Sequence, residues 1–192
     1  RVMEYGTMYR TLQDIDWKIK YSLHEAMNYA FMESVYDSFN PLNDSSPDEK
    51  KAFYFIENAL YRTSTAWDIL AQFYRLFYRI PVEADKVYYN QIFNPNSSNA
   101  SCFKNDADKI HQYLKEENDN DSFSGAHKYV NDIRNKMTHR NAPAVATASN
   151  FDMNLKMPPV YVLTMVIDDY KKAEEFLTAI IKRIDESLQK ED

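Results

Sequence analysis

Hydrophobic residues recur at steps of three and four over four long stretches of the chain, which is the pattern of amphipathic helices. In the first stretch, from about Thr11 to Phe39, the apolar positions are Leu12, Ile15, Ile19, Leu23, Ala26 and Ala30. In the second, which reaches about Arg79, they are Phe53, Ile56, Leu60, Thr63, Trp67, Leu70, Tyr74 and Phe77. The unbroken alternation of the second stretch is typical of a seam in a helix bundle.

Capping and breaking residues set the ends of these two helices. Asn40-Pro41 ends the first. The segment Ser46-Pro47-Asp48-Glu49 opens the second, because serine caps a helix, proline suits the first turn, and a glutamate three residues after the serine can close a capping box. Pro81 ends the second helix, and we expect a short helix over 83–92 in the less regular segment that follows.

Three more helices are expected in the second half of the chain. A short one covers 106–117, and a main one runs from about Ser124 to His139 or Arg140 with a stripe of Ala126, Val130, Ile133 and Met137. After a long connection over 141–159, the last main helix carries Val166, Tyr170, Ala173, Leu177, Ile180, Ile184 and Leu188 on its seam. The pattern predicts an all-α fold, an antiparallel bundle of about four main helices with additional short helices, as one domain over residues 1–192.

Composition excludes several classes of protein. Only two glycines are present, too few for a phosphate-binding glycine loop, a Rossmann fold or the turns of a β-barrel. Cys102 is alone, so no intrachain disulfide or cysteine-based zinc site can form. We expect Cys102 to be half-buried and the protein to be cytoplasmic. The sequence contains no run of eighteen apolar residues, so no membrane span is expected.

The net charge of −6 disfavours a protein that coats nucleic acid by bulk charge, but it permits a local basic site. Because the sequence opens with Arg1 rather than Met, we expect it to be incomplete at that end.

The helix expected over 124–140 carries polar residues on the side opposite its apolar stripe. At about 100° per residue, that outward face holds Lys128, Asp132, Asn135 and His139. Arg134 lies at the flank, where its long side chain can turn either way. We expect a substrate or a second subunit to meet this face, since the core of one subunit does not cover it.

The segment Arg134-Asn135-Lys136-Met137-Thr138-His139 resembles the motif of the HEPN superfamily. Proteins of that superfamily carry an Arg, then four to six residues, then a His, with a polar residue after the Arg. The likeness covers six residues closely and the all-helical architecture loosely.

The resemblance implies a metal-independent endoribonuclease without a cofactor, in which Arg134, His139 and Asn135 are catalytic. The RNA 2′-hydroxyl attacks the adjacent phosphorus, and a histidine can move the proton near neutral pH. An arginine stabilises the charge that gathers on the phosphate. Lys128, Lys136 and Arg140 are the expected substrate-binding residues. Family members bring two copies of the motif together in one cleft, so we expect a homodimer.

The resemblance to the HEPN superfamily also implies a biological role for the protein. Toxin, phage-defence or RNA-processing roles are expected, with an antitoxin or regulatory protein as a possible partner, and the acidic composition favours a selective or folded RNA target. Members that a nucleotidyltransferase antitoxin regulates often carry a Tyr two residues after the His, but this chain has Asn141 there, so that regulation is not supported. The connection over 141–159 follows the histidine directly, and we hypothesise that it gates the cleft.

Plainer interpretations remain open. Arg134 can form a surface ion pair with Asp132 or with an acid on the last helix, and His139 can simply favour a helix C-terminus. The pair Asp168-Asp169 is expected to be solvated, and no histidine has metal-ligand spacing. The tyrosines Tyr74, Tyr78, Tyr88 and Tyr89 can stack on RNA bases, although core and rim positions are commoner for such residues.

Two alternatives to a ribonuclease also remain. One is a HEPN-like bundle that binds a partner protein or a nucleotide without turnover. The other is a bundle of unrelated ancestry.

Overall fold

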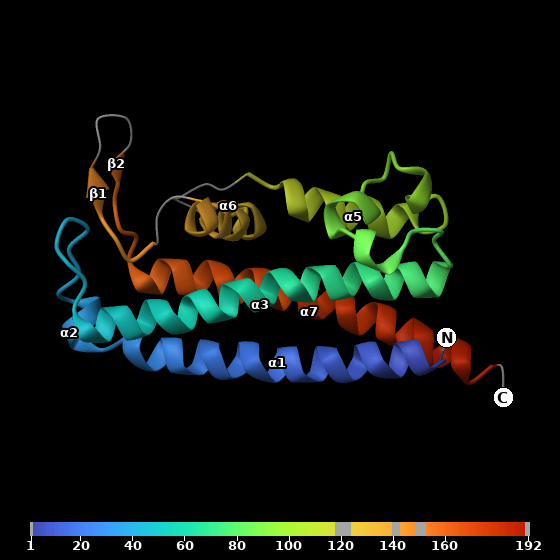
Figure 1. The fold of residues 1–192 in the computed structure, drawn as a ribbon, viewed down its shortest axis with the longest axis horizontal. Coiled ribbons are helices and arrows are strands. Elements are labelled where there is room, and N and C mark those ends of the chain that lie inside the picture. The colour runs from blue at the N-terminus through green and yellow to red at the C-terminus, as the bar shows by residue number, and fades with distance from the viewer. Residues whose placement is uncertain (1, 118–123, 140–142, 149–152, 191–192) are drawn as a thin grey trace.

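Three long helices run side by side in the computed structural model, which describes residues 2–117, 124–139, 143–148 and 153–190 (Figure 1). They are α1 (Val2–Ala30), α3 (Pro47–Tyr78) and α7 (Pro159–Leu188). Figure 1 shows α1 running opposite to α3 and α7, which point the same way because the chain between them returns to the end where α3 begins. The predicted all-α bundle is confirmed.

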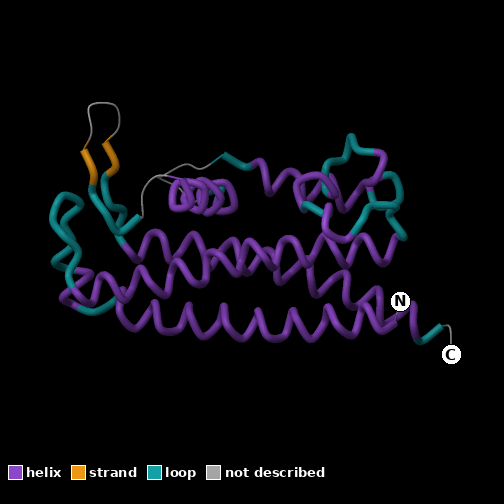
Figure 2. The backbone as a smooth tube through the Cα atoms, in the orientation of Figure 1, coloured by secondary structure: helices purple, strands orange, loops and turns teal. Residues whose placement is uncertain are grey.

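Two further helices lie on the opposite side of α3 and α7 from α1 (Figure 1). They are α5 (Lys104–Lys115) and α6 (Ala126–His139), and α6 packs mainly against α7 while also touching α3 and α5. Figure 2 shows that most of the loops gather at the two ends of the molecule. None of the described helices is long and apolar enough to cross a membrane.

The capped end of α3 was predicted well, and the end of α1 was not. Ser46 is the N-cap of α3, accepting a hydrogen bond from the backbone N–H of Glu49 at 3.1 Å. The first helix begins nine residues earlier than expected, at Val2, because Tyr5 is buried and extends its apolar stripe. It ends at Ala30, and the expected continuation is a separate short helix, α2 (Glu33–Tyr36), since Met32 adopts an extended backbone conformation.

The segment between α3 and α5 contains short pieces in place of the single helix expected over 83–92. These are a 3₁₀ turn at Ala84–Lys86, α4 (Tyr89–Ile92) and a second 3₁₀ turn at Ser98–Ala100. Cys102 is exposed, which corrects the expectation of a half-buried thiol.

The connection after α6 holds a small hairpin that the sequence pattern did not predict. Strand β1 (Thr147–Ala148) pairs antiparallel with β2 (Met153–Asn154). A buried ion pair at the base of the hairpin joins Lys156 to Glu49 at the start of α3, with Nζ and Oε1 2.8 Å apart. The Glu49 side chain therefore faces Lys156 and the Ser45 hydroxyl, 2.8 Å away, instead of completing the capping box.

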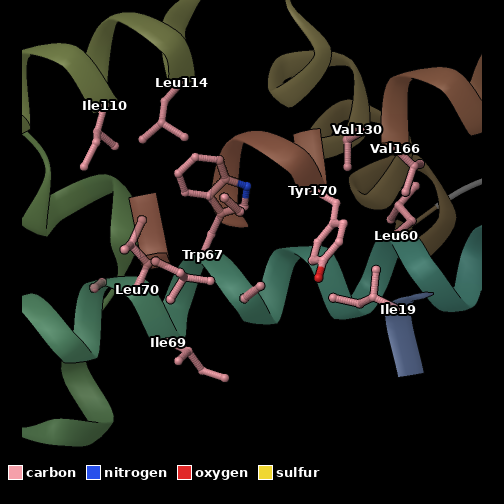
Figure 3. Packing of buried hydrophobic residues seen from close by; sticks show 14 of the residues in the cluster. Ile19, Leu60, Trp67, Ile69, Leu70, Ile110, Leu114, Val130, Val166 and Tyr170 are labelled. Atoms are coloured by element: carbon pink, nitrogen blue, oxygen red, sulfur yellow. The ribbon is translucent and has the colours of Figure 1, made fainter. Parts of the chain in front are cut away.

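The core fills the space between α1, α3 and α7 and continues between these helices and the second layer, and it includes Trp67, which has no exposed surface. Figure 3 shows Trp67 and Leu70 of α3 among Ile110 and Leu114 of α5, with Val130 of α6 and Val166 of α7 further along the same interior. Burying side chains of this size contributes about 1.5–3 kcal/mol each, before the entropy lost on folding is counted. This packing holds α6 in a defined position.

Candidate functional site

Helix α6 carries the predicted motif and buries the predicted stripe. Ala126, Val130 and Ile133 are buried, and Met137 packs against the core. Asn135 and Lys136 are exposed, as expected, while Arg134 is half-buried at the flank of the helix. His139 is the last residue of α6, but its side chain lies outside what is described, and Arg140 lies outside the described residues.

Lys128 is half-buried, and its ammonium group forms an ion pair with Glu117, just after α5. A substrate phosphate would therefore have to compete with this carboxylate for Lys128. Lys136 is exposed, so of these two predicted substrate-binding lysines it is the more accessible to a phosphate.

Arg134 faces a carboxylate on α3 that sequence reasoning did not consider. Its guanidinium is close enough to Asp68 for its charge to act on that carboxyl group. Burial raises the pKa of Asp68, and both a hydrogen bond from the backbone N–H of Tyr89 and the charge of Arg134 oppose the rise. The hydrogen bond from Arg134 to the side-chain oxygen of Asn135 is long, at 3.4 Å. Arg134 thus keeps donors that a phosphate can use.

A buried polar cluster joins α3, α5, α6 and α7, and Asp169 is its centre. Asp169 has no exposed surface, so the predicted solvated acidic pair at 168–169 is wrong for this residue. Its carboxylate accepts hydrogen bonds from Trp67 Nε1 at 3.2 Å, from the Tyr113 hydroxyl at 3.1 Å and from His127 Nδ1 at 3.1 Å. A buried charge is tolerated only when it is paired and hydrogen-bonded, and these three donors meet that need.

His127 connects this carboxylate to Tyr89 on α4. The imidazole is 7% exposed, and its Nε2 lies 3.1 Å from the Tyr89 hydroxyl. Burial raises the pKa of Tyr89 to about 12, while the charge of Arg134 opposes that rise more strongly than Asp169 or Asp68 adds to it. The Tyr89 hydroxyl is therefore within hydrogen-bonding distance of the buried His127, and the charge of Arg134 acts on it.

The sequence held a signal for part of this cluster. His127 and Arg134 are seven residues apart, which places them on the same face of α6 two turns from each other. Asp169 falls three residues after Val166 and four before Ala173, in step with the buried seam of α7. Nothing in the local pattern could show Tyr89 or Asp68, because α4 and α3 bring them to α6 only in the folded chain.

The described residues contain no group of three His, Cys, Asp or Glu side chains that could hold a metal ion. Of the four tyrosines considered for base stacking, Tyr74 is buried and packs against Phe93 and Phe103, whereas Tyr88 is exposed. A stacking role for Tyr74 is therefore wrong, and one for Tyr88 stays a prediction.

Comparison with known proteins identifies the family. Among curated proteins and solved structures, none was found that matches the chain. The family model described as HEPN_Cthe2314-like HEPN matches residues 17–190, which include the second half of α1 and all of α3, α5, α6 and α7. The chain therefore belongs to the HEPN_Cthe2314-like family of HEPN domains.

Proposed function

We propose that this HEPN domain is a metal-independent endoribonuclease that acts as a homodimer. The observation that carries the proposal is the segment Arg134-Asn135-x-x-x-His139 at the C-terminal end of α6, with Asn135 exposed and Arg134 beside it. Family membership supports the same activity.

The residue types fit cleavage by the 2′-hydroxyl of the RNA itself. In that reaction the hydroxyl oxygen bonds to the adjacent phosphorus, the bond from phosphorus to the 5′-oxygen breaks, and a 2′,3′-cyclic phosphate remains. His139 serves as the group that removes or returns a proton, because imidazole can do either near neutral pH. Arg134 binds the phosphate as its negative charge grows, and Asn135 orients His139 or donates a hydrogen bond.

A second copy of the chain completes the cleft in this proposal. One Arg and one His are few groups for phosphodiester cleavage, and two copies of α6 facing each other double them. Lys136, Arg140 and, against competition from Glu117, Lys128 bind the flanking phosphates. An antitoxin or regulatory protein would act by covering the same face of α6.

The test is RNA cleavage in EDTA by the wild type, His139→Ala and Arg134→Ala on a mixed panel of tRNA and mRNA. We expect His139→Ala to lose about 10²- to 10⁴-fold in rate, the usual contribution of a positioned acid–base group, and Arg134→Ala to lose about 10²- to 10³-fold, that of one donor to the charge of the transition state. The matched control is His24→Ala, because His24 is exposed on α1, on the far side of the bundle from α6.

Product ends and particle mass complete the test. Products with 2′,3′-cyclic phosphate ends and a dimeric mass by light scattering support the proposal. Equal cleavage by the wild type and His139→Ala would remove the catalytic role of His139. Absence of cleavage by the wild type would favour a module that binds a partner or nucleotide without turnover.

A further inference from the structure

Five aromatic side chains of α1 and α3 contact one another on the surface of the bundle and form what we term the aromatic face. Phe55 of α3 is its centre, with the ring centres of Tyr21 and Tyr29 of α1 at 6.4 Å and 6.0 Å. Tyr54, the neighbour of Phe55 on α3, has its ring centre at 5.2 Å. Trp17 stacks on Tyr21 with the ring centres 5.5 Å apart, so the rings make one continuous patch across the two helices.

The outer rings of the aromatic face are open to solvent. Trp17 and Tyr54 are each 62% exposed and Tyr21 is 49% exposed, whereas Phe55 and Tyr29 are half-buried and pack against the core. Single exposed rings are common on protein surfaces and need no explanation, but a continuous apolar patch generally marks a binding surface. The aromatic face is such a patch, and the core beneath it holds its rings in position.

Glu25 and Arg62 place two opposite charges on the aromatic face. Glu25 lies on α1 between Tyr21 and Tyr29, one helical turn from each. Arg62 lies two turns beyond Phe55 on α3. Because Phe55 contacts both tyrosines, Glu25 is level with it along the bundle. Arg62 is then about 10 Å further along, for seven residues at 1.5 Å each.

Neither of these charges is neutralised within the subunit. In the part of the chain that the structure describes, Glu25 and Arg62 form no ion pair, whereas the nearby Lys18 and Lys51 each pair with an aspartate of their own helix. The hydrogen bonds of Arg62 use Nη1, which donates to the backbone and side-chain oxygens of Asn58. Its other N–H groups therefore remain for a carboxylate.

We propose that the aromatic face binds the aromatic face of a second copy of this chain across a two-fold axis. Such an axis reverses the order of the charges, so Glu25 of one copy meets the partner's Arg62 at both ends of the contact, and the exposed rings of the two copies meet between them. Tryptophan, tyrosine and arginine are also the residue types that most often dominate the binding energy of protein interfaces. The aromatic face supplies all three types.

The balance of charge on the aromatic face disfavours nucleic acid as its ligand. Lys18 and Lys51 are already paired with carboxylates, so a phosphate would have to compete for them. The unpaired carboxylate of Glu25 would repel the phosphates of a bound strand. A second copy of the chain instead provides a cation for Glu25 and a carboxylate for Arg62.

This contact is compatible with the dimer through α6 that the proposed function requires. The helix α1 lies on the other side of α3 and α7 from α6, so one chain can use both surfaces at once (Figure 1). Three exposed rings and one charge pair at each end make a small interface, and small interfaces are weak. We therefore expect the contact to form in concentrated solution and to dissociate on dilution.

Charge reversal followed by mixing tests the pairing of Glu25 with Arg62. In Glu25→Arg two cations meet at each end of the contact, and in Arg62→Glu two carboxylates meet, so each variant alone should associate at least about tenfold more weakly than the wild type. An equimolar mixture of the two variants sets a cation against a carboxylate at both ends and should recover the association. Only a contact between copies of this chain predicts that recovery.

Sedimentation equilibrium over a series of protein concentrations at low salt measures the particle mass. At high concentration the wild type and the mixture should approach about twice the mass of either variant alone, because a two-fold contact joins particles in pairs. Trp17→Glu should show the same halved mass. The matched control is Met3→Glu, since Met3 is 84% exposed on the first turn of α1, away from the aromatic face, and this variant should keep the wild-type mass. Thermal unfolding verifies that each variant is folded.

Equal masses for the wild type and Trp17→Glu at every concentration would overturn the inference, as would a mixture no heavier than its separate components. A loss of RNA affinity in Trp17→Glu at unchanged mass would assign the aromatic face to nucleic acid and would also overturn it. The halving of the mass is expected whether the smaller particle is a dimer through α6 or a single chain. The result is therefore independent of whether the protein cleaves RNA.

Discussion

Replacing Lys156 by methionine removes one half of the buried ion pair that ties the hairpin to α3. The side chains of Lys156 and Glu49 are 1% and 8% exposed, with Nζ and Oε1 2.8 Å apart. Methionine has nearly the same length and no charge, so the change leaves the Glu49 carboxylate without its cation. Removing one partner of a buried pair generally costs about 3–5 kcal/mol of folding free energy.

The Glu49 carboxyl group, once it has lost its cation, can take up a proton, and this limits the folding free energy that the variant loses. Holding a glutamic acid of ordinary pKa in its neutral form costs about 3.7 kcal/mol at pH 7 and about 1 kcal/mol at pH 5. We therefore expect Lys156→Met to lose about 3–4 kcal/mol at pH 7, equivalent to a fall in Tm of roughly 6–15 °C for a chain of this size. Because the folded variant holds a proton that the unfolded chain releases, its deficit relative to wild type should shrink as the pH falls towards 5.

Urea unfolding followed by circular dichroism measures the loss at both pH values. The control is Lys18→Met, which removes an exposed ion pair with Asp14 and should change stability by less than about 1 kcal/mol. The double variant Lys156→Met with Glu49→Gln should recover part of the loss. A deficit below about 1 kcal/mol at pH 7, or one that does not change with pH, would show that water reaches this pair and would refute the reasoning.

Three further changes test other parts of the fold. Burial raises the pKa of Asp106, but hydrogen bonds from Arg183 and Tyr74 and the charges of Arg183 and Lys109 together outweigh burial and leave the pKa lowered. The stability that ionised Asp106 contributes is therefore present above the ordinary pKa of about 3.9 and is lost as the pH falls through the lowered value, and an acid titration by circular dichroism should show less of this loss in Asp106→Asn. Ser46→Ala should cost α3 about 1 kcal/mol in urea unfolding, while Ser46→Gly should cost only a few tenths, and equal losses would contradict the cap. Trp17 is 62% exposed and Trp67 is fully buried, so iodide should quench the tryptophan fluorescence of the wild type but hardly that of Trp17→Phe. Strong quenching in Trp17→Phe would contradict the burial of Trp67.

Local sequence signals predicted the helices whose ends are marked by capping or helix-breaking residues. The serine cap, Pro47 and Pro81 placed α3 within a residue or two, and Pro159 marked the start of α7. The outward position of Asn135 and the flanking position of Arg134 followed from helical periodicity alone. Both depend only on residues within one helix, which is why the sequence sufficed.

The features that sequence reasoning missed depend on contacts between helices. Asp169 is polar, and only the donors that reach it from α3, α5 and α6 make its burial possible. Tyr89 lies in an irregular segment whose hydrophobic residues have no clear helical period. Its contact with His127 could therefore not be predicted from the local sequence. The strands of the hairpin after α6 are too short to show the alternation of apolar and polar residues by which a strand is predicted. The base of the hairpin is held by the contact of Lys156 with Glu49, which is far away in the sequence.

The contacts of Ser45 bear on how well the fold would accept extra residues inserted between β1 and β2. Its hydroxyl donates to the carbonyl oxygen of Ala144 at 2.8 Å and lies 3.3 Å from Nζ of Lys156, so it holds the chain just before the hairpin and just after it. Because the two stems meet at one fixed point, lengthening the tip between them changes only loop entropy, about 0.6 kcal/mol for each doubling. The hairpin tip is therefore a natural place to graft a peptide tag or a reporter domain while α6 keeps its position.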